Sequence, residues 1–231
     1  MLKKISYLGK NILLVSFLYL FIFSFVYLVL EPRTLKSATD TKYVTLNQEV
    51  VEEIGLTCST NVSGLTAING ITGGTSNGSF DCNVITSNSG GYNMKLKKSA
   101  SLCHSTLGCG TDKQFDDYAT TTDPLDFNWA NTPSGAEYWG FNVSSSTYPT
   151  AVTQRFKDNG SQCNTGTNVT DGKCWTRIPT GPTEETVVNR TTATTPEGDT
   201  TYFGVRIQAG SNNALNSGTY TTTIVVTATT N

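Results

Sequence analysis

The chain has 231 residues, a net charge of −2 and only 15% charged residues, and it is rich in Gly, Ser, Thr and Asn. This length is enough to bury a substantial core, in one large β domain or two small ones. The low charge argues against a nucleic-acid-binding protein, because such proteins need a basic surface. The Thr-rich tracts favour strands and turns over helices.

The first 38 residues differ in composition from the rest. Lys3, Lys4 and Lys10 precede an uncharged, apolar run over residues 11–30. About 20 apolar residues are enough for a helix to cross a bilayer, and lysines before the run direct its N-terminus to the cytoplasm. We therefore expect residues 1–38 to form an N-terminal signal anchor that contacts the membrane through one hydrophobic, transmembrane helix.

A cleaved signal peptide is the alternative interpretation of the same segment. Cleavage near Ser37 or Ala38 would place Leu35 or Lys36 at the −3 position, where a small residue is usual. Both interpretations export residues 39–231. The expected location is the extracellular face of the cytoplasmic membrane or, after secretion, the cell surface of a bacterium.

Strand signals with a period of two recur along the exported part, separated by turns rich in Gly, Asn and Ser. The alternating residues are, in chain order, Ile54, Leu56 and Cys58; Phe80, Cys82 and Val84; Tyr92, Met94 and Leu96; Trp139, Phe141 and Val143; Phe203, Val205 and Ile207; and Tyr220, Thr222, Ile224, Val226 and Ala228. No exported stretch has a sustained helical period. The pattern predicts an all-β protein, an antiparallel β-sandwich of Ig-like or jelly-roll-like type over residues 39–231.

Six cysteines lie in the exported part, an even number that is typical of a compartment where disulfides form. Pairing of nearest neighbours is the simplest of the connectivities that six cysteines allow. It joins Cys58 to Cys82, Cys103 to Cys109, and Cys163 to Cys174. A zinc cluster of Cys103, His104 and Cys109 is the alternative for the middle pair, but it lacks a fourth ligand nearby.

Residues 99–135 show few alternations, and we expect an irregular insertion on the sandwich there. The densest acidic region of the chain lies in and just beyond it, with Asp116, Asp117, Asp123, Asp126 and Glu137. The simplest interpretation is a solvated loop. Oxygen ligands on an irregular loop are also what calcium uses, so the four aspartates are weak candidate ligands, although their spacing is not that of an EF-hand. No other metal or cofactor is expected.

Catalytic residues are not evident in the sequence. His104 is the single histidine, and no nucleophile-elbow motif accompanies it. Among the aromatic residues, Trp139 and Trp175 are expected in the core. Trp129, between Asn128 and Ala130, is the best candidate for an exposed contact residue, with burial in the core as the alternative.

Four short sequence segments resemble those of known proteins: Ile71-Thr72-Gly73-Gly74, Arg155-Phe156-Lys157-Asp158-Asn159-Gly160, Val188-Asn189-Arg190-Thr191-Thr192 and Ser217-Gly218-Thr219-Tyr220. Because of these segments, the chain resembles uncharacterised exported β-sandwich proteins of uncultured small-genome bacteria. More loosely it is similar to Gram-positive surface domains of the WxL type, but it lacks their paired Trp-x-Leu signature. The resemblance implies surface exposure and brings no catalytic residues.

These observations favour a non-catalytic cell-surface protein that acts in adhesion or surface architecture. Its expected partners are the membrane, further copies of itself, surface glycans or neighbouring cells, and not nucleic acid. A pilin-like filament subunit is the first alternative, because pilins also place a hydrophobic helix before a β-rich head. However, the glutamate that type IV pilins carry five residues after the cleavage-site glycine is missing after Gly9. An exported glycan-active hydrolase is the second alternative.

Overall fold

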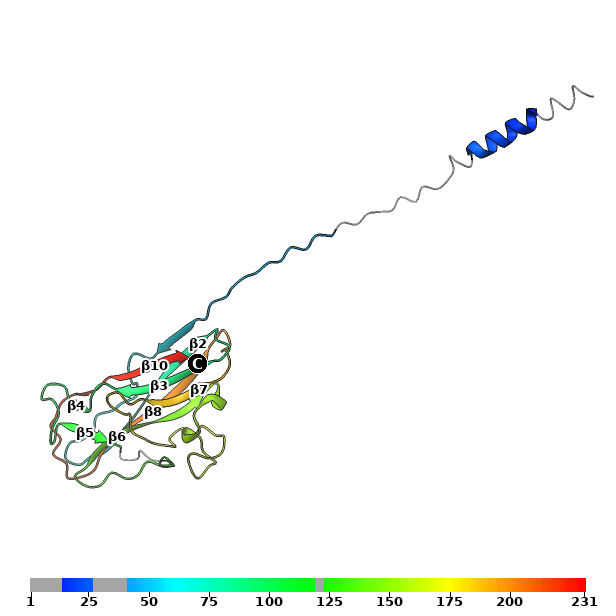
Figure 1. Cartoon of the computed structure of the whole chain (residues 1–231). Helices are drawn as coiled ribbons and strands as arrows, with labels where there is room; N and C mark the ends of the chain where they lie inside the picture. Colours follow the sequence, from blue (N-terminus) through cyan, green and yellow to red (C-terminus); the bar gives the residue numbers. More distant parts are fainter. Residues whose placement is uncertain (1–13, 27–40, 119–122) are drawn as a thin grey trace, which may run out of the picture. The chain divides into compact units, whose positions relative to one another are not determined.

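The computed structural model describes residues 14–26, 41–118 and 123–231 (Figure 1). The chain divides into two units, Met1–Glu49 and Val50–Asn231. In the first unit, residues 14–26 are helical and residues 41–49 have no regular secondary structure. None of the helices in the described ranges is both long and apolar enough to span a membrane. The anchor expected over residues 1–38 falls largely on residues 1–13 and 27–38, which lie outside the described residues.

The second unit is mostly β. Its strands, in chain order, are β1 (Ile54–Cys58), β2 (Gly74–Thr86), β3 (Tyr92–Lys98), β4 (Leu102–His104), β5 (Gln114–Asp117), β6 (Glu137–Ser146), β7 (Glu185–Arg190), β8 (Asp199–Ala209), β9 (Tyr220–Thr221) and β10 (Ile224–Thr230). Two short 3-10 turns, η1 (Pro149–Ala151) and η2 (Gln154–Phe156), precede β7. The prediction of a mostly β chain is confirmed.

The strands form two sheets. A seven-stranded sheet has the order β1-β2-β8-β6-β5-β4-β9, and a three-stranded sheet has the order β10-β3-β7. In Figure 1 the C-terminal strand β10 lies beside β3. All pairings are antiparallel except β5 with β6, which is parallel. The expectation of purely antiparallel sheets is wrong at this point. The chain between β5 and β6 covers residues 118–136, which is long enough for the crossover that parallel neighbours require.

Side chains from both sheets share one core. Alternate residues of the central strands supply it, because successive side chains of a strand point to opposite faces. Phe80, Phe141 and Phe203 come from the large sheet, and Tyr92 and Met94 come from the small one. All five are at least nine-tenths buried. The period-two pattern therefore identified the inner faces of β2, β3, β6 and β8 correctly.

The last expected strand is divided in two. Tyr220–Thr221 forms β9 at the end of the large sheet, and Ile224–Thr230 forms β10 at the edge of the small sheet. Thr222 and Thr223 carry the chain from one sheet to the other. Alternation alone does not reveal this step, because both short strands keep the same period.

The structure supports the three cysteine pairings favoured by nearest-neighbour spacing. Cys58 is bonded to Cys82, Cys103 to Cys109, and Cys163 to Cys174. Cys58 lies directly opposite Cys82 in the register of β1 and β2. The disulfide therefore attaches β1, which lies at one end of the large sheet, to β2, the strand with which it pairs.

Candidate functional site

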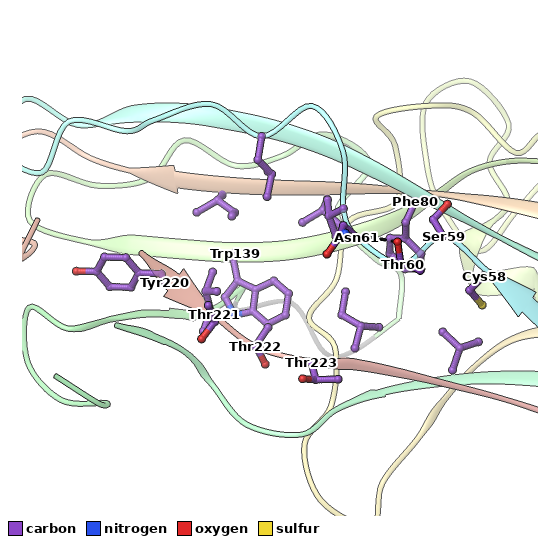
Figure 2. A pocket seen from close by; sticks show the side chains of 17 residues that line it. Cys58, Ser59, Thr60, Asn61, Phe80, Trp139, Tyr220, Thr221, Thr222 and Thr223 are labelled. Carbon is purple, nitrogen blue, oxygen red and sulfur yellow. Dashed lines mark hydrogen bonds between the residues drawn. The ribbon is translucent and has the colours of Figure 1, made fainter. Parts of the chain in front are cut away.

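A groove is lined by residues from both sheets. It has a volume of 460 Å³ and runs between the chain after β1 and the segment that joins β9 to β10. Figure 2 shows Trp139 in the middle of the groove, between Tyr220 and Phe80. Val205, Ile207 and Ile224 add further apolar surface. We call this feature the inter-sheet groove.

The groove follows from the unequal size of the sheets. Three strands are too few to cover seven, so residues within 59–71 and 215–223 line the space over the rest of the inner face of the large sheet. A second cavity of 590 Å³ continues over the same face and shares Leu65, Leu102, Ile207 and Tyr220 with the first. Leu65 remains 43% exposed at the boundary between the two cavities.

One strand beside the groove, β10, has an open edge. Ser99 N donates to Thr223 O just before β10, and Asn231 N donates to Gly91 O just after it. Hydrogen-bonded pairs alternate along an antiparallel ladder, so Val225, Thr227 and Thr229 bond to β3. The even-numbered residues between them direct their N–H and C=O groups away from β3. Within the described ranges, no strand pairs with that side of β10.

The other sheet has a similar open edge at β1. Glu53 O accepts from Ser87 N, and Ser59 N donates to Asp81 O, so Ile54, Leu56 and Cys58 direct their backbone groups outward. Leu56, expected on an inner face, is 36% exposed because β1 lies at the edge of its sheet. The strands β1 and β10 approach each other without forming a ladder.

Tyr220 lies at the wall shared by the two cavities. Its hydroxyl is 2.8 Å from Asn216 O and 3.3 Å from Asp112 O, and it donates to these carbonyls. Burial raises the pKa of Tyr220, and the nearby carboxylates of Glu137 and Asp112 add to the effect. Burial also raises the pKa of Glu137, and the nearby carboxylates of Asp116 and Asp112 raise it further. Tyr220 is therefore a neutral hydrogen-bond donor at physiological pH.

The four candidate calcium ligands have four different partners. Asp117 pairs with the buried Lys98, while Asp116 accepts a 2.9 Å hydrogen bond from Gln114. Asp123 lies 3.2 Å from Arg155 Nε, and Asp126 accepts a 2.6 Å hydrogen bond from Tyr118. Among the described residues, no three acidic, His or Cys side chains are grouped as metal ligands would be. The aspartates are thus not gathered into one cluster there.

Trp129 lies in a small aromatic cluster with only 9% of its surface exposed. It stacks on Tyr118 with ring centroids 4.1 Å apart and meets the edge of Trp175 at 5.1 Å. The three residues come from separate segments of the chain, and the fold brings them together. In this structure Trp129 is therefore a packing residue with little surface left for contact.

His104 is a buried histidine with both ring nitrogens engaged. Nδ1 accepts from the backbone N–H groups of Thr106 and Leu107, and Nε2 lies 3.1 Å from Ser217 O. This arrangement fits the neutral tautomer that carries its proton on Nε2. The neighbouring Cys103 and Cys109 are bonded to each other, so the zinc alternative loses two of its three ligands.

The comparisons with known proteins provide no family for this chain. No protein-family model matches it, and a search of curated proteins finds no significant relative. The functional argument therefore rests on the geometry of the groove and of the strand edges.

Proposed function

We propose that this is a non-catalytic protein of the bacterial cell exterior that builds surface architecture by adding a strand from one copy to the next. A single observation carries the proposal: the open edge of β10 borders a groove that is lined by apolar residues from the inner face of the other sheet. A strand added there would gain backbone hydrogen bonds from β10 and would place alternate side chains in the groove.

The shared core of the two sheets supports the finer fold as part of this proposal, an antiparallel β-sandwich of Ig-like or jelly-roll-like type. The three disulfides support export, because such bonds persist in oxidising compartments. The hydrophobic segment over residues 11–30 would tether the protein to the membrane or direct its release.

The proposed occupant of the groove is residues 41–53 of a second copy. All residues of this segment are exposed, and none belongs to a helix or strand. In an extended strand, Val44, Leu46 and Val50 would lie on the same face, with Gln48 as the polar residue between Leu46 and Val50. Burying each of these side chains would contribute about 1.5–3 kcal/mol relative to its exposed state.

Insertion into a second copy is favoured over folding back onto the same molecule. Residues 41–53 lead directly into β1 and contain neither Gly nor Pro, which are the residues that tight chain reversals use most. Each copy would then offer one segment and one groove. Such head-to-tail contacts generate rings or open filaments, which makes a filament subunit one form of the same proposal.

Analytical ultracentrifugation of the full-length protein in a mild detergent tests the assembly. We expect the wild type to form species larger than dimers as its concentration rises. The double variant Val44→Asp with Leu46→Asp should remain monomeric, because it would place two charges in an apolar groove. Thr45→Asp with Asn47→Asp is the matched control, because it adds the same charge on the opposite face and should assemble.

A wild type that is monomeric at all concentrations would contradict the proposal, and so would equal loss of assembly in both double variants. The non-catalytic part has a separate test. The wild type should release no reducing sugar from cell-wall or capsular polysaccharides. Activity that is lost when Asp116, Asp117, Asp123 and Asp126 are replaced by Asn would favour the hydrolase alternative.

A further inference from the structure

A lysine occupies the last inward-facing position of β3. Tyr92, Met94, Leu96 and Lys98 alternate along this strand and are all buried, so Lys98 lies where the pattern predicts an apolar side chain. The side chain of Lys98 is 0% exposed. Lysine is almost never fully buried unless its ammonium group is paired, so the surroundings of this amino group need an explanation.

The partner of Lys98 comes from the other sheet. Nζ of Lys98 directly contacts Oδ1 of Asp117, which ends β5 in the large sheet, whereas β3 belongs to the small sheet. The ring of Trp139, which lies opposite Asp117 in the register of β5 and β6, has its centre 5.2 Å from Nζ. The fold therefore holds an amino group against a carboxyl group beside an aromatic ring, with the amino group shielded from water.

An ordinary ion pair leaves the amino group of Lys98 incompletely satisfied. A lysine ammonium has three N–H donors, and Asp117 provides its only hydrogen-bond acceptor within the described ranges. Buried donors without an acceptor are costly, and a buried charge adds to that cost. A secondary amide at the same place would be neutral and would carry a single N–H donor. The surroundings thus suit an amide better than an ammonium.

We propose that Lys98 and Asp117 condense after folding to form an intramolecular isopeptide bond. A proton first passes from the ammonium to the carboxylate within the pair, which gives a neutral amine and a carboxylic acid. The amine then attacks Cγ of Asp117, a C–N bond forms, and the C–O bond to the carboxyl hydroxyl breaks. One water molecule leaves, composed of that hydroxyl and one proton of the amine. The step needs no oxidant, reductant or other co-reactant.

The folded chain supplies the proximity that this reaction lacks in solution. Two groups held in contact in a productive geometry can react with an effective concentration of about 10⁵–10⁸ M. Exclusion of water from Nζ favours a product that carries no charge. The side chain of Asp117 is 30% exposed, so the released water has a path to the solvent.

The isopeptide bond would join the two sheets covalently, which none of the three disulfides does. One disulfide joins β1 to β2 within the large sheet, one links β4 to the loop after it, and one lies between η2 and β7. Thiols do not reduce an amide, so the link between the sheets would persist after reduction of the disulfides. This inference does not depend on the strand-addition proposal.

Peptide mapping of the full-length protein, purified in a mild detergent, tests the bond. After reduction and alkylation, chymotrypsin, which cuts after aromatic and large apolar residues, should release residues 97–102 and residues 116–118. We expect these two peptides to be recovered as one branched species whose mass is their sum minus one water molecule. Because the two peptides are not adjacent in the sequence, a missed cleavage cannot produce that mass.

Variants of the pair and of its neighbours provide the controls. Lys98→Met and Asp117→Ala should each yield the two peptides separately. Lys97→Arg and Asp116→Asn are the matched controls, because each changes the adjacent residue of the same type and should retain the branched species. Recovery of only separate peptides from wild-type protein that is folded by circular dichroism would overturn the proposal, whether or not any variant folds. A branched species that persists in Lys98→Met would also overturn it, because Lys97 would then be the linked residue.

Discussion

Lys98 shows how single charged residues organise this fold. Its side chain is fully buried, it pairs with Asp117, and its ammonium group lies 5.2 Å from the ring centre of Trp139. An ammonium group in such a place needs a counter-ion, because an unpaired buried charge is costly. Asp117, which the sequence offers as a calcium ligand, thus has a structural partner in Lys98.

The dependence of Lys98 on Asp117 gives a prediction for stability. Asp117→Ala should lower the free energy of unfolding by about 3–5 kcal/mol, because it leaves the buried ammonium unpaired. Asp116→Ala should change it by less than about 0.5 kcal/mol, since Asp116 is exposed. Urea titrations of both variants measure the difference, and similar values for the two would contradict the role of the pair.

At the scale of elements, the open edge of β10 determines which backbone groups are available. Ala228 directs its N–H away from β3, whereas Val225 bonds to β3. Proline removes one backbone donor. At position 228 the lost donor would be one that faces away from β3, whereas at position 225 it would be one that bonds to β3.

Ala228→Pro should prevent assembly while the protein stays folded, because no hydrogen bond to β3 is lost. Val225→Pro should lower the free energy of unfolding by about 1 kcal/mol or more, because it removes a ladder hydrogen bond. Circular dichroism melts and sedimentation of both variants give the two readouts. Unchanged assembly of Ala228→Pro would exclude this edge as the acceptor of the added strand.

At the scale of the whole molecule, the strand-addition proposal requires that residues 41–53 remain in the mature protein. Both interpretations of the N-terminal segment satisfy this, since cleavage near Ala38 would leave residues 41–53 in place. The two differ in whether the assembled protein stays attached to the membrane.

We predict that the mature protein retains residues 1–38 and fractionates with the membrane, because no small residue occupies the −3 position of the cleavage site. Mass spectrometry of the N-terminal peptide, combined with fractionation of the native cells, measures both properties. An N-terminus near Ala38 in the soluble fraction would show a cleaved signal instead.

The sequence alone determined the features that depend on neighbouring residues. Alternation over a few residues identified the inner faces of β2, β3, β6 and β8, because the side-chain period of a strand is local. Short spacing likewise favoured the three disulfides, since nearby cysteines close small loops. For Cys58 and Cys82, their places on the inner faces of two strands added to the argument.

Tertiary structure decided the features that join distant residues. The division between β9 and β10 depends on which sheet each half meets, and the groove depends on three strands facing seven. The packing of Trp129 against Tyr118 and Trp175 joins three separate segments, and nothing near any one of them in the sequence indicates the others. Strand order is set by contacts between residues far apart in the chain, and a local period contains no information about those partners.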